Sequence, residues 1–413
     1  MKHIAVIGGG ASGLSAAIAA AECGAQVTVL ERLPRVGKKI LLTGNGRCNL
    51  GTRDYAPEQF AARFHGSFSA ARNLLAEFDA DAYFRRFGLL TRTDSAGRMY
   101  PYSNTAASVL DALRFAAEQR GVEFRCGMQV TDLRRKGDVW QIICGNTSVS
   151  ADAVIAAAGG SAAPACGTDG NLLPVLQKLG HSIVPALPAL CPVPTDAARV
   201  KPLAGMRVQA AVTAMLHGKA LKTERGEVQF TAGALSGICV FNLSRLAAIH
   251  GSDMELSLDL LPDLDAAQAA DYLRMLMQQR GHLAGNELLT GVLPRRVGET
   301  LLKQICGKIS GEAHTLLRAG ADIQRLCTLL KDWRFPVAGT AAFTQAQVTA
   351  GGVSGRSLRN DLSSRIVPEL YFCGELIDID GDCGGYNLMW AWCSGDFAGR
   401  RACGCNSAQL RSR

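Results

Sequence analysis

The sequence of 413 residues lacks any apolar run near the ~20 residues that a membrane-spanning helix needs. It also lacks Cys-x-x-Cys and Cys-x4-Cys pairs despite its 14 cysteines, so neither a zinc site nor a redox dithiol is predicted. Cys403 and Cys405 are the remaining metal candidates, and we assign no metal. Because the chain enters an apolar run at Ile4, it has no room for a signal peptide, and we expect a cytoplasmic protein with mostly reduced cysteines.

Acid–base groups and basic stripes are also scarce. There are only 7 histidines, and no Ser-His-Asp set or helical metal pair is visible, so no acid or base is assigned firmly. Arg98 and Tyr100, in the segment GRMYP, are the catalytic candidates. The net charge of +8 is split into short clusters such as Arg85-Arg86 and Arg134-Arg135-Lys136, which are usually solvated faces. Without a continuous basic stripe, no nucleic-acid partner is expected, whereas a small anionic molecule fits the charge.

A glycine-rich turn near the N-terminus is the strongest pattern in the chain. Ile4 to Ile7 predict a strand buried on both faces, and glycines follow at Gly8, Gly10 and Gly13. In this GxGxxG spacing the first glycine allows the tight turn, the second lets a pyrophosphate approach the backbone, and the third lets the next helix pack closely. The Ala-rich segment 11–23 predicts that helix, whose N-terminal dipole favours an anion.

A second strand, Gln26 to Leu30, ends on Glu31, 18 positions after Gly13. A carboxylate at this point can accept hydrogen bonds from both ribose hydroxyls of an adenosine, and it would repel a 2′-phosphate. GxGxxG alone could equally be a flexible turn. The order of strand, glycines, helix, strand and acid predicts a dinucleotide site.

A second glycine loop follows in RLPRVGKKILLTGNGRCNL. Lys39 and the segment Gly44 to Arg47 offer an ammonium group, backbone N–H groups and an amide to a phosphate or a ring edge. We therefore favour a cofactor contact here over a simple turn. Cys48 is more often a small buried hydrophobe than a nucleophile.

The next segments give a coarse order of elements. Helical spacing is found from Pro57 to Phe87, and Ser103 or Asn104 is expected to cap a helix from Thr105 to about Arg120. Alternating residues from 122 to 143 predict strands with a hairpin turn at Gly137-Asp138. Ala153 to Ala158 predicts a buried strand that ends at Gly159, where a cofactor can pass.

Composition shifts near Leu187, where LPALCPVP predicts a linker. Short β-like runs from Gly205 to Phe241 suggest a small barrel or sandwich, and residues 264–331 have mostly helical spacing. The buried-strand pattern returns at Val348 in TAGGV. We therefore expect one cofactor domain, 1–190 and 339–413, split by an insertion at 191–338 with a β-barrel about 191–260 and a helical part about 261–338.

The last motif is LYFCGELIDIDGDCGGYNLMWAWCSGDFAG. Leu370 to Cys373 predicts a core strand, and the Glu375 carboxylate that follows can hold the hydroxyls of a ribityl chain. Gly384-Gly385-Tyr386-Asn387 then opens a helix to about Arg400, whose N-terminus can stabilise negative charge on a reduced flavin. Trp390 and Trp392 are expected to be core residues rather than stacking groups.

With these residues in view, the chain resembles the aminoacetone oxidase-like and bile-acid dienone reductase-like family of FAD-dependent, NAD(P)-linked flavoproteins. The resemblance runs nearly end to end and is carried by GGGASGLSAA, GKKILLTGNGRCN, GRMYP, AGGV and the GE…GGYN stretch. It implies an α/β fold, namely a Rossmann-like two-dinucleotide-binding FAD domain with a parallel sheet and an inserted β-barrel plus helical domain.

The resemblance also implies the residues that hold FAD. The cofactor-binding candidates are Gly8, Gly10, Ser12, Gly13, Glu31, Arg32, Lys39, Gly44, Asn45, Gly46, Arg47, Val130, Ala158, Gly159, Gly374, Glu375, Gly385, Tyr386 and Asn387. One departure stands out. Relatives carry FTHxGLSG where this chain has FTAGALSG, so Ala232 replaces a histidine, and a family substrate does not carry over directly.

These observations predict an FAD-dependent oxidoreductase that acts on a small molecule by hydride transfer through the flavin, linked to NAD(P)H or to O2. NAD(P)H would be a transient electron donor, because no second GxGxxG between strand and helix occurs in the insertion. Two alternatives stay open, a flavin enzyme acting on RNA and a non-catalytic FAD-binding redox sensor. Substrate, electron acceptor, nicotinamide preference and oligomeric state also stay open.

Overall fold

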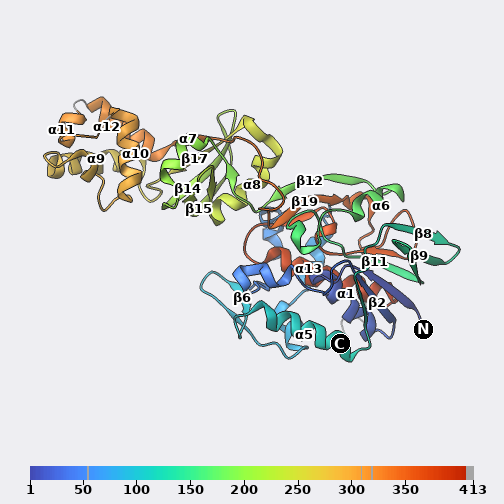
Figure 1. The fold of residues 1–413 in the computed structure, drawn as a ribbon. Coiled ribbons are helices and arrows are strands. Elements are labelled where there is room, and N and C mark those ends of the chain that lie inside the picture. Colours follow the sequence, from blue (N-terminus) through green and yellow to red (C-terminus); the bar gives the residue numbers. More distant parts are fainter. Residues whose placement is uncertain (54, 308, 318–319, 406–413) are drawn as a thin grey trace. The chain divides into compact units, whose positions relative to one another are not determined.

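The structure is a computed structural model that describes residues 1–53, 55–307, 309–317 and 320–405. The chain forms two compact units (Figure 1). Unit 1 combines Met1–Leu187 with Gln347–Arg413, and unit 2 is the continuous segment Pro188–Ala346. Within the described ranges, no helix is both long and apolar enough to cross a membrane.

A five-stranded parallel sheet forms the centre of unit 1, and four of its strands were predicted from apolar runs, whereas the fifth, β7, was expected in the small sheet of residues 122–143. Its order is β20 (Leu370–Phe372), β11 (Ala153–Ala156), β1 (His3–Ile7), β2 (Gln26–Glu31) and β7 (Glu123–Cys126). All four pairings are parallel. Such a sheet is covered on both faces, which explains why β1, β2, β11 and β20 are nearly continuous apolar runs, while the edge strand β7 is largely exposed.

Helices α1 (Ala11–Glu22) and α13 (Tyr386–Ala402) pack against each other in unit 1 (Figure 1). Small residues allow this close approach. A Cβ at Gly395 would lie 2.4 Å from the Ser12 carbonyl oxygen, and one at Gly399 would lie 2.3 Å from that of Ala16. Both predicted helices are confirmed, and Cys23 is the C-cap of α1.

The helix predicted from Thr105 is α5 (Ala106–Gln119), which also packs against α1. Its N-cap is Thr105, without a side-chain capping bond, so the expectation of Ser103 or Asn104 was wrong. The Gly137-Asp138 hairpin turn is confirmed. It joins strands of an antiparallel sheet in the order β10 (Thr147–Ala151), β9 (Val139–Cys144) and β8 (Asp132–Lys136).

The segment 57–87 is not one helical region. Its elements are η2 (Pro57–Gln59), α2 (Phe60–Arg63), β4 (Phe64–Gly66), α3 (Ala71–Ala76) and α4 (Ala80–Arg85). Strand β4 pairs with β21 (Ile379–Gly381), more than 300 residues away. Gly66 has φ +120° and lies where a Cβ would be 2.1 Å from the Asp378 carbonyl oxygen. Tertiary pairing therefore overrides the local helical spacing.

Unit 1 also contains two smaller sheets and a further helix. Strands β3 (Gly51–Thr52), β6 (Arg98–Pro101) and β5 (Thr91–Thr93) form one antiparallel sheet, and α6 is Leu172–Lys178. Strand β12 (Ile183–Ala189) pairs with β19 (Val348–Val353). The predicted linker LPALCPVP was therefore wrong in part, because its first residues lie in β12. β12 has one strand neighbour, so its proline residues, which lack an N–H group, are tolerated there.

Unit 2 contains a six-stranded antiparallel sheet that bears out the predicted barrel. The order is β13 (Val193–Pro194), β16 (Ala234–Ser236), β15 (Lys219–Phe230), β14 (Arg207–Leu216), β17 (Met254–Asp259) and β18 (Trp333–Pro336). A bridge between Thr195 and Val337 joins the two outer strands, so the sheet curls back on itself. Helices α7 (Ala197–Val200) and α8 (Ile238–His250) belong to the same unit.

The helical part of unit 2 lies between β17 and β18 in the sequence. It contains α9 (Ala266–Arg280), α10 (Arg295–Cys306), α11 (Ala313–Leu316) and α12 (Gly320–Lys331). A capping box between Asp265 and Gln268 begins α9. The expected helical segment 261–338 was too long at its end, because β18 returns to the barrel with Trp333 and Phe335 fully buried.

Candidate cofactor site

The glycine turn joins β1 to α1, and its three glycines face different surroundings. A Cβ on Gly8 would lie 2.6 Å from the Ala157 carbonyl oxygen, and one on Gly13 would lie 1.9 Å from that of Gly8. A Cβ on Gly10 would meet no protein atom within 4 Å. Gly8 and Gly13 therefore serve packing, whereas Gly10 lies beside open space at the N-cap of α1. This space fits a phosphate group next to the helix N-terminus.

Glu31 lies at the carboxyl end of β2 and is only 9% exposed. Its carboxylate accepts hydrogen bonds from the N–H groups of Gly9 and Leu33, both at 2.8 Å. The carboxylate is thereby fixed next to the glycine turn. A carboxylate has about four acceptor positions, so two remain for ribose hydroxyls.

Two other predicted residues lie near this end of the sheet. Met128, two residues before Val130, donates its N–H to the Glu31 carbonyl oxygen at 2.8 Å, which brings the loop after β7 beside β2. Val130 is buried, and its carbonyl oxygen accepts a bond from the Asn171 amide. Arg32 forms an ion pair with Asp169 at 2.6 Å. Arg32 therefore has a protein partner, which sequence reasoning did not identify.

The turn after β11 meets the glycine turn. A Cβ on Gly8 would lie 3.1 Å from the Ala158 Cα, and Gly159 has φ +75°. Ser12, in the first turn of α1, meets the turn after β20, because a Cβ on Gly374 would lie 2.4 Å from the Ser12 hydroxyl oxygen. The sites predicted at the ends of β1, β11 and β20 are thus neighbours.

The second glycine loop has an unusual backbone. Gly44, Asn45 and Gly46 adopt left-handed φ values of +56°, +54° and +78° in succession. The Arg47 guanidinium that follows lies over the Tyr100 ring, 4.9 Å from its centroid. Tyr100 is buried, and its ring also lies 3.5 Å from where a Cβ on Gly44 would be. The structure thus brings the loop and Tyr100 together.

Arg98, the other catalytic candidate, is placed differently. Its Nε lies 3.1 Å from Asp94 Oδ2. The backbone N–H of Arg98 donates to the same carboxylate, so Arg98 closes the turn between β5 and β6. Tyr100 therefore contacts the second glycine loop, whereas Arg98 pairs within its own turn.

The start of α13 depends on a residue that sequence reasoning missed. Gly385, the N-cap, has φ +96°, and a Cβ there would lie 2.5 Å from the Gly51 carbonyl oxygen. When the Asn49 amide is oriented with its oxygen toward the Gly385 N–H, it accepts from that group at 3.1 Å and donates to the carbonyl oxygens of Gly51 and Met99. Asn49 is the last residue of the GRCN stretch, and its place in that motif was the signal in the sequence that could have identified it.

Tyr386 and Asn387, the first two residues of α13, have partners within the protein. The Asn387 side chain donates to the Gly381 carbonyl oxygen at 2.7 Å and accepts from the Gly381 N–H at 2.8 Å. The Tyr386 ring packs edge-on against Phe64, with centroids 5.6 Å apart. These contacts leave the backbone of the first helical turn, rather than the Asn387 amide, as the group available to a cofactor.

Other residues singled out from the sequence are structural. Trp390 and Trp392 are buried, and their indole N–H groups donate to the carbonyl oxygens of Gly374 and Leu50, which confirms the core assignment. Burial raises the pKa of the Cys48 thiol to about 12, so this thiol is a poor nucleophile. In the part of the chain that the structure describes, no group of His, Cys, Asp or Glu is arranged to hold a metal.

Residues 2–401 match the family model described as HI0933-like protein Rossmann domain. The chain belongs to this family. It is 37% identical to a 3-dehydro-bile acid delta(4,6)-reductase of Clostridium scindens, covering 97% of this chain and 99% of that protein. It is 27% identical to a ribosomal RNA dihydrouridine synthase of Escherichia coli, covering 94% and 95%.

Solved structures support the fold alone. The 3-ketosteroid-delta4-(5alpha)-dehydrogenase of Rhodococcus jostii RHA1 has a TM-score of 0.52 at 16% identity, covering 97% of each chain. The 3-ketosteroid delta1-dehydrogenase of Sterolibacterium denitrificans has a TM-score of 0.54 at 12% identity, covering 98% of this chain and all of that one. The protein is an FAD-dependent oxidoreductase, and the open space at Gly10 next to the fixed Glu31 fits that cofactor.

Proposed function

We propose that this enzyme reduces a carbon–carbon double bond conjugated to a carbonyl group in a small molecule, with NAD(P)H as a transient electron donor. The printed names of the relatives describe one chemistry. A 3-dehydro-bile acid delta(4,6)-reductase acts on double bonds next to a 3-oxo group, and a dihydrouridine synthase saturates the double bond of a uracil ring. In both cases hydrogen is added to an alkene that a carbonyl polarises.

The observation that carries the proposal is the 37% identity to the bile acid reductase, which spans nearly the whole of both chains. The two ribosomal RNA dihydrouridine synthases are less similar, at 27% and 25%. A small unsaturated ketone is therefore favoured over RNA. RNA is kept as the second candidate substrate because the match to each of these two relatives covers 94% of this chain.

The same proposal assigns the cofactor residues. When bound, FAD supplies the ring that accepts and donates hydride. Gly10 and the N-terminus of α1 would bind the pyrophosphate, Glu31 the adenosine ribose, and Glu375 the ribityl hydroxyls. The remaining candidates would line the same site; they are Gly8, Ser12, Gly13, Arg32, Lys39, Gly44, Asn45, Gly46, Arg47, Val130, Ala158, Gly159, Gly374, Gly385, Tyr386 and Asn387.

Reduction of an alkene also needs a proton, and Tyr100 is the residue that we propose for it. Tyr100 is buried beside the left-handed loop, and the Arg47 cation lies over its ring. A phenol in this position could hold a proton where water is excluded. Arg98 would act indirectly, because its contacts with Asp94 hold the β5–β6 turn that presents Tyr100.

Two broader assignments belong to the proposal. We assign residues 1–190 and 339–413 to FAD binding and 191–338 to the insertion, supported by the division of the chain after Leu187 and Ala346. We also place the protein in the cytoplasm. All 14 cysteines are free thiols, which suits a reducing compartment.

An anaerobic half-reaction tests the function. The enzyme is first reduced with NADH or NADPH and then mixed with a 3-oxo-delta(4,6) steroid acid. We expect the flavin to reoxidise and the steroid to gain hydrogen, whereas the saturated 3-oxo steroid should cause no reoxidation. Reoxidation by ribosomal RNA with formation of dihydrouridine, and not by the steroid, would select the RNA candidate. Failure of both oxidants would contradict the proposed reaction.

A further inference from the structure

Lys39 and Glu375 form an ion pair that joins two segments 336 residues apart in the sequence. Lys39 Nζ lies 2.8 Å from Glu375 Oε2 and donates a second bond to the Ala162 carbonyl oxygen at 3.2 Å. The other oxygen of Glu375, Oε1, accepts from the Thr349 N–H at 3.0 Å. Both oxygens of this carboxylate are therefore held by the protein.

Thr349, in β19, connects the turn after β11 to this cluster. Its hydroxyl oxygen accepts from the N–H groups of Ser161 at 2.7 Å and Ala162 at 2.9 Å. Gly160 lies against the same groups, because a Cβ there would be 2.3 Å from the Thr349 hydroxyl oxygen and 2.9 Å from Glu375 Oε1. The cluster is thus closely packed, and Glu375 has little freedom to rotate.

The pair still has bonding capacity. An ammonium group carries three N–H donors, of which Lys39 uses two here. A carboxylate has about four acceptor positions, and Glu375 uses two. The side chains of Lys39 and Glu375 are 23% and 21% exposed, so the pair is partly desolvated but reachable. Glu375 can therefore accept ribityl hydroxyls without releasing Lys39.

The negative charge of FAD provides a physical reason for the ion pair between Lys39 and Glu375. FAD brings a pyrophosphate with negative charge into a site that already contains the carboxylates of Glu31 and Glu375. In a partly desolvated site, like charges repel more strongly than in water. A cation bound to Glu375 offsets this repulsion and orients the carboxylate at the same time.

We propose that Lys39 is a positioning residue for FAD, which acts by holding Glu375 rather than by binding the cofactor itself. The inference rests on the placement of Glu375 at the ribityl chain and does not depend on the substrate class. Removing Lys39 leaves Glu375 without its counter-charge, and Oε2 loses the protein group that holds it, while the Thr349 N–H still binds Oε1. Loss of a charge-assisted bond corresponds to about a 10- to 100-fold weaker binding.

The test is FAD titration of the flavin-free protein, followed by quenching of flavin fluorescence, so no turnover is involved. Lys39→Met should weaken FAD binding about 10- to 100-fold. Lys38→Met is the matched control, because Lys38 is the neighbouring lysine and its ammonium donates only to the Ala165 carbonyl oxygen among the described contacts. The control should keep the wild-type affinity within about twofold. Equal affinity of Lys39→Met and wild type would contradict the proposal.

A double-mutant cycle separates positioning from direct binding. In the Glu375→Gln background, Lys39→Met should cost little further affinity, since the carboxylate that it positions is already gone. Lys39→Arg, which keeps the charge, should recover most of the affinity. Additive losses in the double variant would show that Lys39 binds FAD directly, and failure of arginine to rescue would contradict the role of charge. Unfolding temperatures of the flavin-free variants check that each one folds.

Discussion

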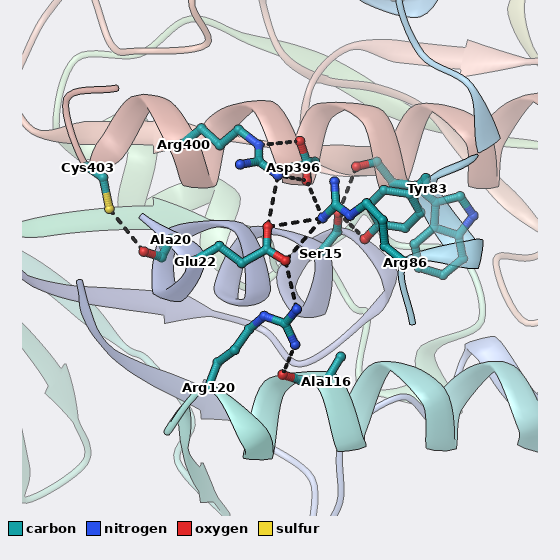
Figure 2. A network of polar contacts seen from close by, with 11 residues as sticks. Ser15, Ala20, Glu22, Tyr83, Arg86, Ala116, Arg120, Asp396, Arg400 and Cys403 are labelled. Carbon is teal, nitrogen blue, oxygen red and sulfur yellow. Dashed lines mark hydrogen bonds and ion pairs between the residues drawn. The ribbon is translucent and has the colours of Figure 1, made fainter. Parts of the chain in front are cut away.

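Arg400, near the end of α13, donates from its Nη2 to Glu22 Oε2 at 2.9 Å, near the end of α1 and 378 residues away in the sequence. Glu22 also pairs with Arg86 at 3.1 Å and Arg120 at 2.9 Å. Asp396 pairs with Arg86 and Arg400 at 3.4 and 2.8 Å, and Figure 2 shows the network. This network fixes the ends of α1 and α13 that lie farthest from the glycine turn and from Gly385.

We predict that Glu22→Gln lowers the free energy of unfolding by about 1–3 kcal/mol, because it removes the charge shared by three arginines. The side chains of Glu22 and Arg400 are mostly buried, at 21% and 11% exposed, so solvent screens them less than a surface pair. Glu118→Gln is the control. Glu118 pairs with Arg114 on the exposed side of α5, and its loss should cost about 0.5 kcal/mol or less. Urea unfolding measures both, and equal costs would show that the network adds no more stability than an exposed ion pair does.

A pair of glycine variants tests the pyrophosphate loop. Gly10→Val places a branched side chain in open space, so the protein should fold but lose FAD. Gly13→Ala drives a Cβ to 1.9 Å from the Gly8 carbonyl oxygen, so it should destabilise the fold itself. Circular dichroism and flavin absorbance of the purified variants distinguish the two effects. A folded Gly10→Val protein with full FAD content would rule out this loop as the pyrophosphate site.

The proposed use of NAD(P)H predicts ping-pong kinetics. The six-stranded sheet of unit 2 is antiparallel throughout its ladder, which is unlike a nicotinamide-binding βαβ domain. NAD(P)H should therefore bind transiently, reduce the flavin and leave before the second substrate enters. Initial-rate measurements at several fixed concentrations should give parallel double-reciprocal lines. Intersecting lines, together with a stable complex with the oxidised nicotinamide, would indicate a dedicated site.

Buried thiols predict a loss of stability in alkali. Burial raises the pKa of Cys48 and Cys373 to about 12, whereas a thiol in an unfolded chain titrates near ~8.5. The contribution of the two protonated thiols to the free energy of unfolding is fully present below about pH 8.5. Between there and about pH 12 the folded state binds more protons, so the free energy of unfolding falls as pH rises, by up to ~1.4 kcal/mol per pH unit for each thiol.

Urea midpoints measured from neutral pH to the highest pH at which the protein still folds check this slope. Cys48→Ala should flatten it, whatever its effect on stability at neutral pH. Cys126→Ala is the control, because Cys126 is exposed and its thiol is less desolvated. If the Cys48→Ala slope equalled that of wild type, burial of this thiol would not govern the alkaline loss.

Short-range patterns in the sequence determined the half of the site that we propose for nucleotide binding. Gly8, Gly10, Gly13 and Glu31 lie within 24 consecutive residues, and the strand, turn and helix that present them follow from local apolar spacing and from the backbone freedom of glycine. Four of the five parallel strands were predictable for the same reason, since burial on both faces leaves a continuous apolar run, whereas the exposed edge strand β7 carries no such signal.

Only the tertiary structure decided which distant residues meet. The bonds of Lys39 to Glu375 and of Asn49 to Gly385 join segments more than 300 residues apart, and no local pattern encodes such partners. In the segment 57–87 a local pattern was present but misleading. Its helical spacing was overridden because β4 pairs with β21. Local propensity differs by only about 1 kcal/mol per residue, so strand pairing and burial from elsewhere in the chain can reverse it.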